Sequence, residues 1–254
     1  MNKPTVNRIV ADISAELKRH ADSRRAEGAM RYFKGDESIA FLGVDTPTLR
    51  RIVKDQVKEL KHKWTLGEAV QACGKMLKAK EHEIRAAGFL LLSGFKKMFT
   101  PALLYDAYQW LNSRLDNWAL VDGFCMEITT PLLDQYPEAE ETLKEWSQNS
   151  NLWVRRAALV TLVAGARRGK RLDLTYRTAG EHFNDPEDLI HKAVGWLLRE
   201  AGKSDSRRLR NFLLKHGPQI PRTTLRYAIE RFPEKERKHL LASTRKPKLK
   251  GGCA

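Results

Sequence analysis

The sequence predicts an all-α protein in which pairs of helices repeat along the chain and form an α-solenoid with a concave basic face. Three observations support this fold class. Helix-start signals recur throughout the chain, the alternation of apolar and polar residues that indicates β-strands is never sustained, and one short motif returns at a nearly constant interval. The 254 residues are enough to bury a sizeable core without a metal or disulfides. We expect a single repeat domain over residues 1–243 and a basic, disordered tail over residues 244–254.

Capping residues and prolines mark where most of the helices should begin. A Ser, Thr or Asp side chain accepts a hydrogen bond from the first helical turn, and proline suits that turn because it has no N–H to leave unpaired. Thr65 and Glu68 have the spacing of a capping box. The other expected starts, in chain order, are Thr46-Pro47, Thr100-Pro101, Asp185-Pro186, Ile220-Pro221 and Phe232-Pro233. Between these starts, apolar residues recur every three or four positions, which is the period of an amphipathic helix.

A basic residue followed by small residues marks the internal repeat. The matching segments are Arg85-Ala86-Ala87, Arg156-Ala157-Ala158, Lys192-Ala193-Val194 and Arg226-Tyr227-Ala228. The first interval spans two periods, and Asp122 fills the missing position, which gives steps of 37, 34, 36 and 34 residues. Two helices and two turns fill such a period in α-solenoids of the HEAT and TPR types. We favour the HEAT type because the TPR consensus residues are absent.

The repeat also predicts where a site should lie. Equivalent positions in stacked repeats lie side by side, so Asp122, Arg156 and Lys192 should form a row across neighbouring helices. Trp118 precedes Asp122 by four residues and Trp196 follows Lys192 by four, which places both indoles on the face of that row. Because solenoids bind ligands on their concave surface, we expect the site there.

Each of these residues also has a structural interpretation that the sequence leaves open. Asp122 could stabilise a developing cation, or it could be a surface carboxylate paired with Arg156. Trp118 and Trp196 could attract a cationic ligand with their ring faces, or they could be core residues. Arg156 could contact a phosphate, or it could link two helices. No phosphate-binding loop, dinucleotide motif or zinc-binding helix motif is found.

Charge is the most unusual feature of the composition. The 46 basic and 31 acidic residues give a net charge of +15 and an isoelectric point near 9.8. This excess indicates a polyanionic partner, nucleic acid first and an anionic membrane second. The longest apolar run, residues 86–92, is too short to span a bilayer. The N-terminus has no apolar signal core, and three widely spaced cysteines (Cys73, Cys125 and Cys253) suit a reducing compartment, so we expect a cytoplasmic protein.

Five collinear segments resemble the AlkD-type DNA alkylation repair glycosylases, a family with HEAT-like repeats. They are Met30–Lys34, Phe41–Arg50, Asn117–Asp122, Leu152–Ala158 and His191–Glu200, and the last two are the most specific. The resemblance implies excision of N3- and N7-alkylated purines from duplex DNA, with no metal or organic cofactor. The partner that it implies is duplex DNA containing such purines. Independently of the resemblance, we expect no membrane partner and take a monomer as the default. Asn117 departs from the family pattern, because an aromatic residue often precedes the cleft tryptophan.

The resemblance assigns roles to single residues. The family's cleft aspartate, its two tryptophans and a nearby arginine match Asp122, Trp118, Trp196 and Arg156. DNA contacts are expected from Arg156 and Lys192, from Tyr32 near the cleft, and from Thr46 and Arg50 at a helix start. Two other function classes stay open. One is a non-catalytic DNA-binding protein that recognises damaged or non-standard DNA, and the other is a protein-interaction scaffold whose charge serves solubility.

Overall fold

The computed structural model describes residues 3–33 and 39–245, and this part of the chain is all-α as predicted. Its only pairing of the β type, within the described residues, is an isolated bridge between Ala40 and Glu81. Most of the tail predicted over residues 244–254 lies outside the described residues, Cys253 included. The chain forms two compact units, residues 1–139 and residues 140–254.

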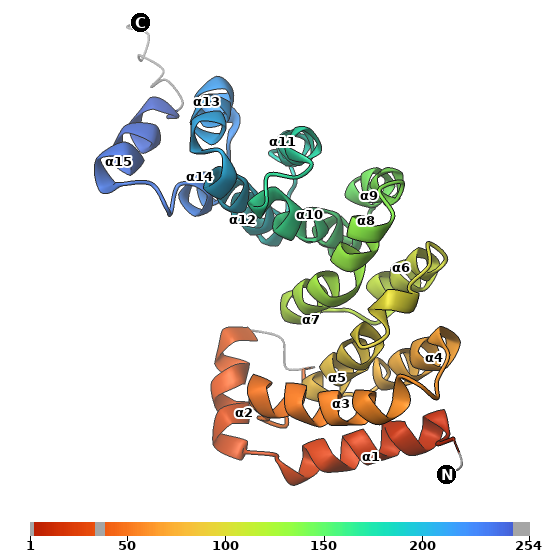
Figure 1. The fold of residues 1–254 in the computed structure, drawn as a ribbon. Helices are drawn as coiled ribbons and strands as arrows, with labels where there is room; N and C mark the ends of the chain where they lie inside the picture. Colours follow the sequence, from red (N-terminus) through yellow and green to blue (C-terminus); the bar gives the residue numbers. More distant parts are fainter. Residues whose placement is uncertain (1–2, 34–38, 246–254) are drawn as a thin grey trace, which may run out of the picture. The chain divides into compact units, whose positions relative to one another are not determined.

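The N-terminal unit is built around one buried helix, α5. Its helices are α1 (Val6–Arg19), α2 (Ser23–Met30), α3 (Thr46–Leu60), α4 (Leu66–Met76), α5 (His82–Ser93), α6 (Leu103–Ser113), α7 (Trp118–Phe124) and α8 (Thr130–Gln135), with short 3₁₀ turns at Arg31–Phe33 and Lys96–Met98. Nearly every residue of α5 is buried, because α1, α3, α4 and α7 all pack against it. Helix α5 is therefore buried on most of its sides even though it carries Glu83 and Arg85, and Figure 1 shows it among α3, α4 and α7.

Helices α7 and α8 are two parts of one continuous helix with a π-helical segment, Cys125–Thr129, between them. The amide of Thr130 donates to the carbonyl of Cys125, five residues earlier, as the π pattern requires. Pro131 explains the irregularity, because it has no N–H for the regular ladder and its ring crowds the preceding turn. Such π segments often mark functional sites, and this one directly follows the turn that carries Asp122.

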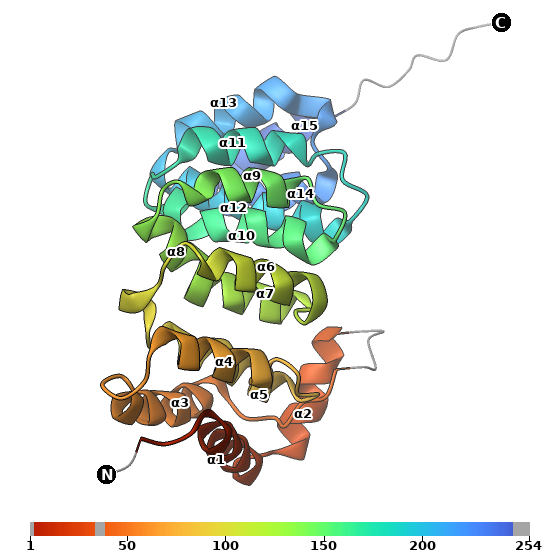
Figure 2. The same ribbon diagram turned by 90° about the vertical axis from the view of Figure 1, so that its right-hand side faces the viewer.

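The C-terminal unit consists of two layers of helices. These are α9 (Ala139–Ser147, which begins at the boundary), α10 (Leu152–Arg167), α11 (Leu172–Glu181), α12 (Asp188–Ser204), α13 (Ser206–His216), α14 (Arg222–Ala228) and α15 (Glu234–Ser243), with a 3₁₀ turn at Gly217–Gln219. In one layer α10 packs on α12, and α12 packs on α14. Figures 1 and 2 show α11 and α13 in the other layer, where α13 also contacts α15.

The sequence repeat falls on one helix of each pair, in phase. Four of the repeat positions lie four residues after the first residue of their helix: Asp122 in α7, Arg156 in α10, Lys192 in α12 and Arg226 in α14. The fifth, Arg85, lies three residues after the start of α5. The interval found in the sequence is therefore the number of residues between the starts of successive helices in the series α5, α7, α10, α12 and α14.

Three of the predicted helix starts are shifted or uncapped, and three are confirmed. Helix α3 is capped by Asp45, one residue before the expected Thr46, because the Asp45 carboxylate reaches the N–H of Thr48 at 2.9 Å. Thr100 caps nothing, and α6 begins at Leu103 without a side-chain cap. Asp185 accepts from the N–H of Glu187 in the turn before α12. The capping box of Thr65 and the starts after Pro221 and Pro233 are confirmed.

The close approach of α12 to α14 depends on Gly195, which gives a stability prediction. A Cβ atom at Gly195 would lie 2.4 Å from Tyr227 Cβ and 2.8 Å from the Thr224 carbonyl oxygen. We expect Gly195→Ala to reduce the free energy of unfolding by about 1–3 kcal/mol, measured by urea denaturation. The control is Gly28→Ala on α2, where a Cβ atom would meet nothing within 4 Å and should stabilise the helix slightly. Equal effects of both substitutions would contradict this packing.

Candidate nucleic-acid interface

A cavity of about 430 Å³ opens in the N-terminal unit beside the repeat position of α7. Its walls come from the first turn of α3, from α5, from α7 and the π segment, and from the loop that holds Phe41 and Val44. Asp122 lines it, together with the small residues Ala119 and Gly123 of the same helix. Gly123 permits the close contact of α7 with α5, because a Cβ atom there would lie 3.0 Å from the Phe89 ring.

Two further carboxylates line the cavity, and both bind groups of the protein. The buried Glu83 accepts hydrogen bonds from the backbone N–H groups of residues 42–44, at 2.7 to 3.3 Å, and so fixes that loop. Glu127, in the π segment, accepts from the Arg50 guanidinium at 2.7 Å and from Ser93 Oγ at 2.8 Å. Arg50, half-exposed on α3, is thereby held at the mouth of the cavity.

Aromatic rings from three parts of the N-terminal unit form a column that ends on Trp118. The Trp118 ring stacks on Phe33, with ring centroids 5.2 Å apart and an interplanar angle of 12°. Phe33 contacts Phe41 at 5.2 Å, and Phe41 stacks on the His82 imidazole at 4.9 Å. Trp118 is 37% exposed, so it is neither a core residue nor isolated. The column joins Trp118 to the wall of the cavity, because Phe41 and His82 line it.

The remaining predicted residues of this unit lie on its surface. Tyr32 is 81% exposed in the 3₁₀ turn beside Phe33. Thr46 is exposed at the first residue of α3, one turn before Arg50. The N-terminal unit therefore brings Asp122, Arg50 and Thr46 together around one cavity. Trp118 reaches the cavity wall only through the aromatic column, and Tyr32 is exposed beside Phe33.

The predicted residues of the C-terminal unit lie on α10 and α12. Arg156 is only 5% exposed, and its Nη1 donates to the Leu189 carbonyl at 2.6 Å, so it links α10 to the start of α12. Lys192 is 40% exposed in its side chain and pairs with Asp188 at 2.8 Å. Its hydrogen bond lowers the pKa of Asp188, against the opposing effect of burial. Trp196 is half-buried one turn further along α12.

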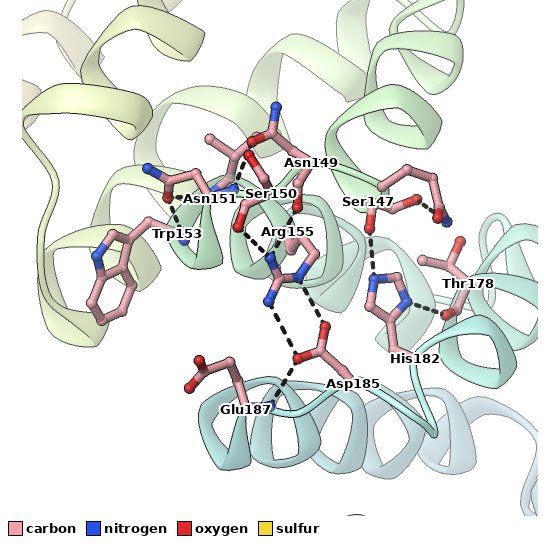
Figure 3. A network of polar contacts seen from close by, with 12 residues as sticks. Ser147, Asn149, Ser150, Asn151, Trp153, Arg155, Thr178, His182, Asp185 and Glu187 are labelled. Atoms are coloured by element: carbon pink, nitrogen blue, oxygen red, sulfur yellow. Dashed lines mark hydrogen bonds and ion pairs between the residues drawn. The ribbon is translucent and has the colours of Figure 1, made fainter.

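A polar network fixes the turns that precede α10 and α12 (Figure 3). Arg155 donates from Nε to Asp185 at 2.8 Å and from Nη1 to the Asn149 and Ser150 carbonyls. Asn151 caps α10 through the N–H groups of residues 153 and 154. Arg155 and Asp185 are both largely buried, so a substitution of either partner would leave an uncompensated charge. The network thereby sets where Arg156 and Trp196 stand in the C-terminal unit.

Sequence reasoning missed Phe33, Phe41, His82 and Glu127. None lies at a repeat position, and none belongs to a motif with a fixed spacing. Phe33 and Phe41 do fall within or beside the segments that carry the family resemblance, which was the one available signal. Among the described residues, no group of three His, Cys, Asp or Glu side chains could hold a metal ion. None of the described helices has the length and apolar character needed to cross a membrane.

The described part of the chain is an all-α protein in which Asp122, Arg156 and Lys192 stand at repeat positions of its helices. The family model described as DNA alkylation repair enzyme matches residues 13–232, so the chain belongs to that family. A solved structure, "Predicted DNA alkylation repair enzyme from Enterococcus faecalis", is similar with a TM-score of 0.75 and 18% identity, over 85% of this chain and 98% of that one. None of the curated proteins compared with the chain matches it.

His82 provides a pH-dependent prediction for the cavity wall. Burial, and secondarily the positive charge of Arg85, lowers the pKa of His82 from 6.5 to about 4. Between these values the unfolded chain binds a proton that the folded chain does not, so stability falls as the pH drops from 6.5 to 4. The loss should reach about 2–3 kcal/mol. His82→Phe should remove that part of the pH dependence in urea denaturation at pH 7 and pH 4.5. An unchanged difference between the two pH values would exclude His82 as the source.

Proposed function

We propose that this member of the DNA alkylation repair enzyme family is a DNA glycosylase that hydrolyses the N-glycosidic bond of N3- and N7-alkylated purines in duplex DNA. The observation that carries the proposal is the position of Asp122, a carboxylate that lines a cavity one helical turn from the exposed Trp118. Family membership supports the class of damage, and the net charge of +15 supports a nucleic-acid partner.

The chemistry of the lesion fits a carboxylate and aromatic rings. An N3- or N7-alkylated purine is cationic in DNA and leaves as a neutral base, so positive charge moves onto the deoxyribose as the bond breaks. Asp122 would stabilise this oxocarbenium-like sugar and orient the attacking water. The ring faces of Trp118 and Trp196 would attract the cationic base and sugar. Selectivity would then follow from the charge and lability of the lesion.

DNA binding is assigned to exposed groups of both units. Arg50 is aligned by Glu127, and Thr46 is exposed one turn before it. Tyr32 is exposed in the 3₁₀ turn Arg31–Phe33, and Lys192 is half-exposed on α12. Arg156 differs, because its guanidinium is buried against Leu189. We therefore propose that Arg156 supports binding through the position of α12, which carries Lys192 and Trp196.

The substitution Asp122→Asn tests the catalytic role. It keeps the size of the side chain and removes the charge, so single-turnover release of 7-methylguanine should fall by about ten- to a thousandfold. DNA affinity should stay equal or rise slightly, because a negative charge has left a surface that faces phosphates. Base release is measured beside equilibrium DNA binding.

The matched control is Asp55→Asn, which removes an exposed carboxylate of α3 that pairs only with Lys58 among the described residues. It should leave release unchanged. Thermal melting checks that both variants fold. Unchanged release by a folded Asp122→Asn variant would remove Asp122 from the mechanism and favour a non-catalytic DNA-binding protein.

A further inference from the structure

A second cavity, of about 360 Å³, lies in the C-terminal unit between α14 and α15. Arg226 of α14 lines it, together with Glu230 from the turn that follows α14. Glu234, Arg237 and Lys238 line it from α15. No predicted site residue belongs to this cavity.

The charges around this cavity are not balanced. Glu230 forms an ion pair with Arg199 of α12, and Glu234 forms one with Lys238 at 2.7 Å. These pairs use both carboxylates of the cavity wall. Arg226 and Arg237 have no carboxylate partner in the described part of the chain, so two positive charges face one small volume. Two guanidinium groups with unused donors match the oxygens of a phosphate.

The surroundings concentrate this positive charge further. Arg222, at the first residue of α14, has its pKa lowered by burial and by the nearby charges of Arg226 and Arg245. Arg222 therefore lies close enough to Arg226 and to Arg245 to be repelled by each of them. Such an arrangement opposes folding, and an anion bound beside it would relieve the repulsion.

The repeat places Arg226 beside the residues assigned to DNA. Arg226 occupies in α14 the position that Lys192 occupies in α12, and the two helices pack against each other. Equivalent positions on packed helices lie on the same face. Glu230 follows Arg226 by four residues, as Trp196 follows Lys192. Glu230 also forms an ion pair with Arg199 of α12. The cavity therefore lies one repeat beyond Trp196.

We propose that Arg226 and Arg237 bind a backbone phosphate of the DNA that flanks the lesion. The ligand is a phosphodiester, and its identification as DNA rests on the proposed function. Packed helices are about 8–10 Å apart, and successive nucleotides of one strand rise about 3.4 Å along the duplex axis. The bound phosphate should accordingly lie roughly three nucleotides from the base that Trp196 contacts.

The test compares the salt dependence of duplex-DNA affinity for the wild-type chain and the double variant Arg226→Gln, Arg237→Gln. The slope of log K against log salt should become less steep by about one unit, as expected for the loss of one phosphate contact. Arg226→Lys, which keeps the charge, should retain most of the slope. Single-turnover release of 7-methylguanine at saturating protein should stay within about twofold of wild type, because the site is a contact outside the reacting centre.

The matched control is Arg177→Gln. Arg177 is an exposed arginine of α11, in the other layer of the same unit, and has no ion pair in the described part of the chain. Its loss should leave the slope unchanged. Thermal melting separates misfolding from lost contacts, and the double variant should melt at or above the wild-type temperature because repulsion has been removed. A slope equal to that of wild type in the folded double variant would overturn the proposal.

Two further results separate this inference from the proposed function. A changed slope without any base release by the wild-type chain would keep the phosphate site and overturn the glycosylase. Normal base release by the wild-type chain, with a slope that the double variant leaves unchanged, would support the glycosylase and overturn the phosphate site. Inorganic phosphate serves as a competing probe: if it raises the melting temperature of the wild-type chain but not of the double variant, while the DNA slopes are equal, the cavity binds free phosphate and the DNA assignment is wrong.

Discussion

The arrangement of the candidate residues depends on one buried arginine in each unit, which links a helix that carries a repeat position to the start of the next such helix. Arg85 of α5 is 6% exposed and pairs with Asp116, directly before α7, at 2.9 Å. Arg156 of α10 makes the corresponding link to Leu189, at the start of α12. A guanidinium has five donors in a rigid fork, so one buried side chain can fix both the spacing and the register of two helices.

This constraint explains why the repeat could be found in the sequence and why part of its meaning could not. A basic residue occupies four of the five repeat positions, and at two of them, Arg85 and Arg156, it donates to a group at or just before the start of the next helix. The period predicted the helical pairs correctly. The same residue type then serves two purposes. Arg156 is buried as a link, whereas Lys192 is half-exposed and Arg226 is exposed. Residue type and spacing are the same in both cases, so only burial separates a structural cation from one that can meet a ligand.

The cavity beside Asp122 was less accessible to sequence reasoning, for physical reasons. Its walls come from helices far apart in the chain, and the aromatic column joins Phe33, Phe41 and His82 through loops that have no period. The π segment follows from Pro131, but its effect on the neighbouring turn depends on how α7 packs against α5. The cap of α3 could not be predicted for a similar reason. Asp45 and Thr46 are both residue types that cap helices, and only the folded backbone shows that Asp45 is the cap.

The central claim is that Asp122 lines the active site of a DNA glycosylase. An assay of base release by the wild-type protein tests this claim most directly. Purified protein is incubated with methylated duplex DNA, and the freed bases are separated by chromatography and compared with spontaneous depurination. We predict that 3-methyladenine or 7-methylguanine is released faster than the spontaneous rate, in proportion to the amount of protein. Release at the spontaneous rate, from DNA that the protein demonstrably binds, would contradict the account.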